Sequence, residues 1–213
     1  MRMIRTLTTI AAVVALAGCA GLVVDPPAVV TVTASPADGR APLLVQFTAA
    51  VANEGGPLVE YAWDFGDGTQ HTSASASPVG HEYTRPGTFE VQLVVTVDDE
   101  TTCSDSTTVT VENRPPYVSC RLSSDTPVVG ERVLFDGSGS FDADGELVDF
   151  AWDFGDGETA RGTRVSHVYD EIGVYTITLV VEDDAGGTAA LTHTVTVHLG
   201  GSGGCSGGSP ICL

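Results

Sequence analysis

The hexapeptide Trp-Asp-Phe-Gly-Asp-Gly occurs twice in this chain of 213 residues, at 63–68 and at 152–157. Two shorter patterns recur in the same order, namely His-x-Tyr at 81–83 and 167–169 and Thr-Val-Thr-Val at 108–111 and 194–197. The spacing between copies falls from 89 to 86 residues, so the first copy has three extra residues between its Trp and its Tyr. Recurrence at one long period indicates consecutive copies of a structural unit. We therefore predict two homologous domains, over 27–112 and 113–198, with a stiff proline-containing join at 113–116.

Within each copy, apolar residues recur at every second position. Aromatic residues lead this alternation, namely Tyr61, Trp63 and Phe65 in the first copy and Phe150, Trp152 and Phe154 in the second. A period of two is typical of a strand with one buried face. Turn sequences separate the runs, and no stretch after the N-terminal segment has the period of an amphipathic helix. We therefore predict an all-β chain of two tandem immunoglobulin-like β-sandwiches, with the Trp and Phe of each hexapeptide in the core.

The two acids of the hexapeptide allow two interpretations. Asp64 and Asp67 could form a catalytic or metal-binding pair, or they could belong to a tight turn after the strand. An acid–base pair needs carboxylates that converge in an apolar cleft, whereas these two straddle a turn on a very acidic chain. Gly66 and Gly68 tolerate the positive φ that a tight hairpin requires. We therefore interpret the hexapeptide as a structural turn.

The repeated histidines, His81 and His167, also allow two interpretations. Each imidazole could be a ligand or a base, or it could hold the corner of a strand. Tyr83 and Tyr169 follow two residues further on, and a tyrosine at such a corner typically bonds the main chain through its hydroxyl. We favour the structural interpretation for both histidines.

The N-terminus carries an export signal. Arg2 and Arg5 precede an apolar run over residues 7–17, which is shorter than the ~20 residues that span a membrane. The run ends in Leu-Ala-Gly-Cys at 16–19, which resembles the lipobox of bacterial lipoproteins. The alternatives are a plain secretory signal or an uncleaved anchor.

The lipobox resemblance implies that residues 1–18 are removed, that Cys19 is lipidated and that residues 19–26 form a tether. A diacylglycerol with a further acyl chain anchors a protein firmly. Ala20 follows the cysteine where inner-membrane lipoproteins carry Asp. We therefore expect a lipid-anchored protein, preferably at the outer membrane or cell surface.

Four further cysteines are expected in an oxidising compartment. Four cysteines allow three pairings. Cys205 and Cys212 are close together in a Gly/Ser-rich tail over 199–213 and could close a small loop. Cys103 and Cys120 share the parity of apolar neighbours, so we expect both to point inward, either as thiols or as one bridge.

The recurring motifs resemble those of the polycystic kidney disease (PKD) repeat family. The resemblance rests on the hexapeptide, the His-x-Tyr and Gly-x-Phe/Tyr patterns and the closing Thr-Val-Thr-Val strand, and it covers roughly residues 27–198. The second copy also matches the Ser- and Asp-rich loop of the family, at 137–145. The resemblance implies an immunoglobulin-like sandwich that acts as an extracellular, non-catalytic spacer and binding module.

A candidate calcium site lies in the second copy. Asp142 and Asp144 alternate before Gly145, and such carboxylates can converge on Ca²⁺, which takes six to eight oxygens. The same pattern is also an ordinary polar turn. Some bacterial PKD domains that look like this bind calcium with these loop acids and an Asn at the domain start, which implies Asn113 here. The first copy reads Ala-Ala-Val-Ala-Asn-Glu-Gly-Gly at 49–56, so we expect calcium only in the second domain.

Composition excludes other classes of function. The formal net charge is −19, and all nine basic residues are Arg, so the surface repels nucleic acid. The metalloprotease motif His-Glu-x-x-His does not occur in the sequence, and the nucleophile motif Gly-x-Ser-x-Gly occurs only within the Gly/Ser-rich tail, at 200–204 and 204–208.

We therefore expect a non-enzymatic cell-envelope lipoprotein that acts as a spacer or as a binding and adhesion module toward protein or polysaccharide. The alternative is an accessory subunit that targets a secreted hydrolase to its substrate. Exposed aromatic residues would favour that alternative, and Tyr117 is the only aromatic residue whose parity predicts exposure.

Overall fold

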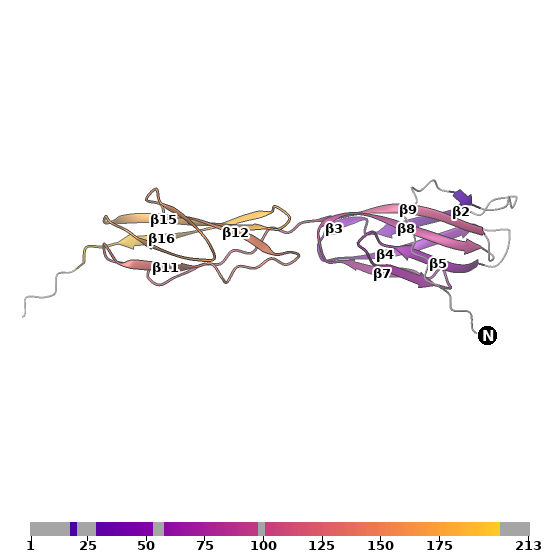
Figure 1. Cartoon of the computed structure of the whole chain (residues 1–213), viewed down its shortest axis with the longest axis horizontal. Coiled ribbons are helices and arrows are strands. Elements are labelled where there is room, and N and C mark those ends of the chain that lie inside the picture. Colours follow the sequence, from indigo (N-terminus) through magenta and orange to yellow (C-terminus); the bar gives the residue numbers. More distant parts are fainter. Residues whose placement is uncertain (1–17, 21–28, 53–57, 98–100, 201–213) are drawn as a thin grey trace, which may run out of the picture. The chain divides into compact units, whose positions relative to one another are not determined.

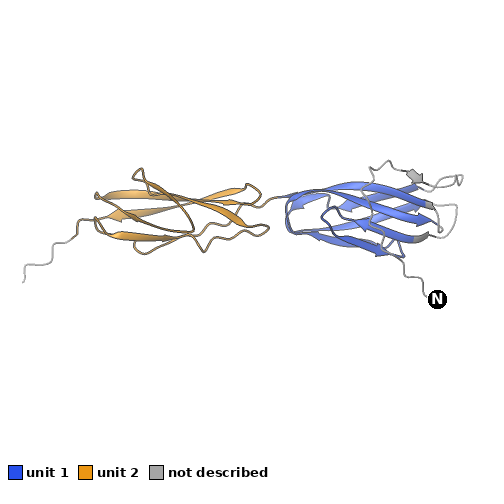
Figure 2. Ribbon diagram, in the orientation of Figure 1, with its two compact units in different colours: residues 1–112 blue, residues 113–213 orange. Residues whose placement is uncertain are grey.

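The computed structural model describes residues 18–20, 29–52, 58–97 and 101–200, which belong to two compact units divided between Glu112 and Asn113 (Figures 1 and 2). All regular elements in these ranges are strands, so the all-β prediction is confirmed. No helix in them is long and apolar enough to cross a membrane. The expected signal segment before Gly18, most of the tether and the cysteines Cys205 and Cys212 lie outside the described residues.

Unit 1 consists of two facing sheets. Its strands are β1 (Gly18–Ala20), β2 (Val29–Ser35), β3 (Asp38–Arg40), β4 (Leu43–Ala52), β5 (Leu58–Asp64), β6 (Gln70–Ser73), β7 (Val79–Tyr83), β8 (Gly87–Val97) and β9 (Thr101–Glu112). One sheet has the order β1-β9-β8-β5-β6, with β3 parallel to the end of β9, and the other has the order β2-β4-β7. The backbone of Cys19, in the segment expected as a tether, lies opposite that of Cys103 in β9.

Unit 2 repeats this architecture, with strands that are as long as their counterparts in unit 1 or shorter. They are β10 (Arg121–Leu122), β11 (Arg132–Asp136), β12 (Leu147–Asp153), β13 (Thr159–Arg161), β14 (Arg164–Val168), β15 (Gly173–Asp183) and β16 (Thr188–Val197). One sheet has the order β10-β11-β14 and the other the order β13-β12-β15-β16. The hexapeptide strands β5 and β12 therefore occupy equivalent places, each beside the long strand of its larger sheet.

Each core is built from the alternation seen in the sequence. In unit 1, Trp63 and Phe65 are 2% and 3% exposed, and Phe47 from the facing sheet lies 5.8 Å from Trp63 between ring centroids. In unit 2, Phe135 packs on Trp152 in the same way, at 5.6 Å. Burying a side chain of this size contributes about 2–3 kcal/mol to folding, so these rings join the two sheets of each sandwich.

The internal cysteines, Cys103 and Cys120, match neither predicted alternative in full. Cys103 is buried in the core of unit 1 and is disulfide-bonded, whereas Cys120 in unit 2 is a half-buried free thiol. A bridge between these two residues is therefore wrong, and the other predicted alternative, two thiols, holds for Cys120 but not for Cys103. Burial raises the pKa of the Cys120 thiol, which keeps this group protonated and poorly reactive at neutral pH.

Candidate functional site

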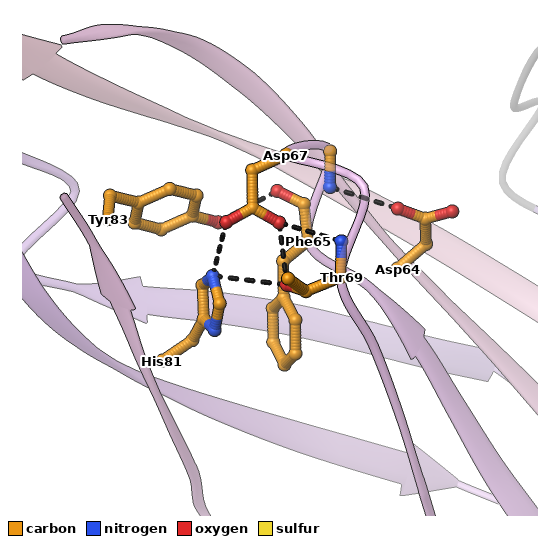
Figure 3. A network of polar contacts seen from close by, with 7 residues as sticks. Asp64, Phe65, Asp67, Thr69, His81 and Tyr83 are labelled. Carbon is orange, nitrogen blue, oxygen red and sulfur yellow. Dashed lines mark hydrogen bonds and ion pairs between the residues drawn. The ribbon is translucent and has the colours of Figure 1, made fainter. Parts of the chain in front are cut away.

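The two acids of the first hexapeptide accept hydrogen bonds from the turn in which they lie (Figure 3). Asp64 Oδ1 accepts the N–H of Gly66 at 3.0 Å. Asp67 Oδ1 accepts the N–H of Thr69 at 3.0 Å and its hydroxyl at 2.6 Å. Asp67 Oδ2 lies 2.7 Å from His81 Nε2. Because these contacts fix the turn locally, both carboxylates serve as structural acceptors.

His81 and Tyr83 hold the same turn from the opposite sheet. The imidazole stacks on Phe65, with ring centroids 4.1 Å apart and planes 4° apart. The Tyr83 hydroxyl is buried and donates to the main-chain oxygen of Phe65 at 2.9 Å. Figure 3 shows how the histidine and the tyrosine approach the turn from β7. This arrangement satisfies a carbonyl that the core would otherwise leave unpaired.

The second hexapeptide has the same network. His167 Nε2 lies 2.6 Å from Asp156 Oδ2, and its ring stacks on Phe154 at 4.2 Å. The Tyr169 hydroxyl donates to the Phe154 oxygen at 3.1 Å. All of these contacts recur except the bond from the Thr69 hydroxyl, whose place in unit 2 is taken by Glu158, and this recurrence identifies the network as part of the scaffold.

The electrostatics of these acids oppose a catalytic role. Partial burial raises the pKa of Asp67, but hydrogen bonds from Thr69 and His81 outweigh it and hold the pKa below its usual value. Burial likewise acts upward on Asp156, and bonds from the Glu158 N–H and His167 bring its pKa below the usual value. A general base or acid at neutral pH requires a raised carboxyl pKa, so the lowered pKa values of Asp67 and Asp156 do not suit that role.

A second set of acids gathers at the end of unit 2 where the unit begins. The structure brings together the three residues predicted for calcium, Asn113, Asp142 and Asp144, and adds Asp183 from the end of β15. Asn113 Nδ2 donates to Asp183 Oδ2 at 2.8 Å, and the N–H of Arg114 donates to Asp144 Oδ2 at 3.1 Å. Asp144 and Asp183 are 5% and 1% exposed, and they are the buried charged residues of the described segments.

Three oxygens of this acidic cluster lack hydrogen-bond partners. Within the described part of the chain, Asn113 Oδ1, Asp142 Oδ2 and Asp144 Oδ1 are buried and unpaired. An unsatisfied buried acceptor costs about 1–3 kcal/mol, and more when it is charged. Three such acceptors on three neighbouring residues are the arrangement that a hard cation would satisfy, because Ca²⁺ binds carboxylate and amide oxygens.

Two glycines allow the acids to approach one another. A Cβ atom on Gly145 would lie 2.1 Å from Asp184 Oδ1 and 2.7 Å from Asp142 Oδ2. A Cβ atom on Gly187 would lie 2.4 Å from Asp183 Oδ2. Side chains at these two positions would therefore displace the carboxylates. Asp184 also accepts the N–H of Glu146 at 3.0 Å, which fixes the loop that carries Asp142 and Asp144.

The electrostatics of the acidic cluster favour the binding of a cation. Burial, together with the neighbouring Asp142 carboxylate, raises the pKa of Asp144 in spite of the bond from Arg114. In the segments that the structure describes, no three Asp, Glu, His or Cys side chains lie so that they could hold a metal ion by themselves, so a cation here would also need the Asn113 amide oxygen. The candidate ligands are two acids and an amide with free oxygens, with Asp183 and Asp184 beside them.

Sequence analysis missed Asp183 and Asp184. Asp183 continues the inward parity of Leu179 and Val181 on β15, where each of these three residues is buried. A carboxylate at an inward position of an otherwise apolar strand was the signal that could have identified it. Its distance of about forty residues from Asp142 in the sequence concealed the relation.

Unit 1 has no counterpart of this buried acid. Leu58 lies opposite Val97 in unit 1, and Leu147 lies opposite Asp183 in unit 2, at the same place in the two sheets. Val97 is a core residue, 2% exposed. The residues that correspond to Asp142 and Asp144 are Asn53 and Gly55 in the sequence, and both lie outside the described residues. The acidic cluster therefore belongs to unit 2.

Comparisons with known proteins agree with this architecture. The chain is 40% identical over 101 residues to a microbial collagenase of Vibrio alginolyticus, and the match covers 40% of this chain and 12% of that protein. It is 34% identical over 144 residues to the pre-pro-metalloprotease PrtV of Vibrio cholerae, over 68% of this chain and 15% of that protein. The chain thus spans less than a fifth of these relatives.

The chain is also similar to a solved domain structure and to a protein-family model. The PKD1 domain of Vibrio anguillarum Epp is 38% identical, with a TM-score of 0.38, and the match covers 42% of this chain and 100% of that domain. The family model of the PKD domain matches this chain twice, at residues 24–111 and 113–199. These two ranges follow the two sandwiches and make up most of the sequence, and the chain belongs to the PKD domain family.

Proposed function

We propose that this protein is a non-enzymatic spacer or binding module of the bacterial cell envelope. Both sandwiches are PKD domains, a non-catalytic type of module, and the similarity to the proteases is confined to such domains. The recurring carboxylates of the chain, those of the hexapeptides, form hydrogen bonds within the turns and with the repeated histidines. These observations leave binding and spacing as the roles that the described residues support.

The second domain, in this proposal, holds one Ca²⁺ ion through Asn113, Asp142 and Asp144, with Asp183 as a further carboxylate. The observation that carries it is the trio of buried oxygens without partners. The cation would neutralise part of the charge and connect the start of the domain to its Asp-containing loop. Its role would be to stiffen this end of the domain.

Calorimetric titration of the full-length chain with CaCl₂ tests the cation site. We expect saturable heat with one site per chain, and loss of this heat in Asp144→Asn. Asp149→Asn is the matched control, because Asp149 is also an acid of unit 2 but pairs with Arg161 outside the cluster. A flat titration of the wild type, or equal loss in the control, would exclude the proposed site.

Membrane attachment through a lipid on Cys19 is part of the same proposal and rests on the Leu-Ala-Gly-Cys sequence at 16–19. Fractionation of cells expressing the protein tests it. We expect the wild type in the membrane fraction and Cys19→Ser in the soluble fraction. Cys120→Ser controls for the loss of a thiol and should stay with the membrane. Soluble wild-type protein would exclude the anchor.

The partner is proposed to be an envelope protein or a polysaccharide. The alternative role, targeting of a secreted hydrolase to a polymer, gains support from one observation. Phe141 is 56% exposed and lies beside the exposed Tyr117, so the expectation that Tyr117 alone would be exposed was wrong. Cross-linking and recovery of partners from intact cells, with Cys19→Ser as the comparison, would distinguish a partner bound at the membrane from one bound nonspecifically.

A further inference from the structure

Unit 2 presents two aromatic rings to solvent as a single surface feature. Tyr117 and Phe141 are 60% and 56% exposed, and their ring centroids lie 5.1 Å apart with planes tilted by 32°. Neither ring belongs to the hydrophobic core of the unit. Single exposed apolar residues are ordinary, but here two large rings from segments far apart in sequence are in contact on the surface.

Main-chain hydrogen bonds join the two segments that carry this aromatic pair. The N–H of Tyr117 donates to the oxygen of Phe141 at 2.8 Å, and the N–H of Phe141 donates to the oxygen of Tyr117 at 3.0 Å. Next to them, the Ser140 hydroxyl accepts the N–H of Ser119 at 3.0 Å and donates to its oxygen at 3.1 Å. Because the main chain that carries the two rings is already fixed, ligand binding loses little backbone conformational entropy at this site.

The surroundings of the aromatic pair restrict the ligand that it can bind. Phe141 directly precedes Asp142, and Asn113, Asp142 and Asp144 of the acidic cluster lie in the same two segments of chain as the pair. The whole chain has a formal net charge of −19, so anionic polymers are repelled at this face. A stable protein interface takes about 20–30 residues from each side, whereas the apolar part of this surface is two rings among Ser, Gly and Asp residues.

We propose that the Tyr117–Phe141 pair is a binding site for a neutral polysaccharide. The apolar faces of sugar rings pack on aromatic rings, and their hydroxyls bond to the polar side chains and main-chain groups that surround the pair. A few polar groups around an apolar contact are typical of small-ligand sites. A polymer offers many copies of the ligand, so weak contacts by many anchored molecules add up. This last step rests on the proposed membrane anchor.

Affinity electrophoresis of the full-length protein tests this site in native gels that contain hydroxyethyl cellulose, galactomannan or the anionic polymer alginate. We expect at least one of the two neutral polymers to retard the wild type and alginate not to do so. The double variant Tyr117→Ala/Phe141→Ala should raise the dissociation constant about tenfold or more. Phe141→Tyr, which keeps an aromatic ring, should bind like the wild type. Val174→Ala removes an equally exposed apolar side chain (69%) from β15 and should have no effect.

Several outcomes would overturn the proposal. The first is that neither neutral polymer retards the wild type. The second is that the double variant is retarded as much as the wild type while its circular dichroism is unchanged. The third is that alginate retards the protein as strongly as the neutral polymers do. Ring-dependent binding of an octa-arginine peptide without retardation by either neutral polymer would assign the pair to a basic protein segment instead. Each gel is run with CaCl₂ and with EDTA. The two proposals fail in different measurements. If the cation proposal is wrong, the calorimetric titration shows no calcium heat. If the polysaccharide proposal is wrong, the protein is not retarded in either gel buffer.

Discussion

At the residue scale, a carboxylate, an imidazole and a phenol turn one short loop into a fixed corner. Asp67 gathers hydrogen bonds from Thr69 and His81, and Tyr83 satisfies the Phe65 carbonyl beneath them. The same contacts recur with Asp156, His167 and Tyr169. Hydrogen bonds to a charged group contribute about 1.5–3 kcal/mol each, more than neutral ones. The repeated hexapeptide therefore serves stability.

Asp67→Asn tests the charge of this corner. The folded pKa of Asp67 is lowered, so its ionisation contributes stability that is present above the unfolded value near 4 and is lost as the pH falls through the folded pKa. We expect the variant to be less stable by about 1–2 kcal/mol at pH 6, with a difference that shrinks below about pH 4.

Unfolding of unit 1 can be followed separately, because each unit contains one of the two tryptophans. In a Trp152→Phe background, the fluorescence of Trp63 reports on unit 1 alone. A stability difference between Asp67→Asn and its parent that stays the same from pH 6 to pH 3 would contradict the assigned role of the charge.

Two glycines of the turn give a second test at this scale. Gly66 and Gly68 both have positive φ, 80° and 90°. A Cβ atom on Gly66 would lie 2.6 Å from the main-chain oxygen of Glu90, whereas one on Gly68 would contact nothing within 4 Å. We expect Gly68→Ala to cost about 1–2 kcal/mol from its backbone conformation alone. Gly66→Ala adds a clash with main chain and should cost at least about 3 kcal/mol. Equal losses in denaturant unfolding would show that the contact with Glu90 is unimportant.

At the scale of elements, the sequence predicts single strands well but does not predict which distant segments come into contact. The alternation around Trp63 and Trp152 predicts β5 and β12, because inward and outward positions can be counted along one strand. Asp183 and Phe141 were missed for the opposite reason. Their neighbours, Asn113 and Tyr117, come from another segment, and only the register of the folded sheets brings them together.

The acidic cluster connects three segments of unit 2, namely the start of the unit, the loop with Asp142 and Asp144, and the end of β15. Asn113 and Arg114 contact Asp183 and Asp144 through side-chain bonds. A cation bound there should slow local opening, because ligands stabilise the state that binds them. We expect amide hydrogen exchange in residues 113–119 and 140–146 to slow when calcium is added, and exchange in 81–89 of unit 1 to stay unchanged. Unchanged exchange in both segments, or slowing that persists in Asp144→Asn, would contradict this role.

At the scale of the whole molecule, one scaffold was used twice and diverged at one end. The two units share the order of their common strands, their aromatic cores and their tyrosine contacts, although β1 and β3 have no counterpart in the larger sheet of unit 2. Unit 1 buries Val97 where unit 2 buries Asp183. The division of labour that we propose follows from this difference. Unit 1 is scaffold alone, and unit 2 adds a cation site and the exposed aromatic pair.

Differential scanning calorimetry of the full-length chain, with and without calcium, tests this asymmetry most directly. Gly66→Ala and Gly155→Ala introduce the same clash in the two units, at 2.6 Å from Glu90 O and from Thr176 O, and so assign each transition to its unit. We predict that calcium raises the transition temperature of unit 2 only and that Asp144→Asn abolishes the rise. A calcium-dependent rise in both units, or in neither, would contradict the account.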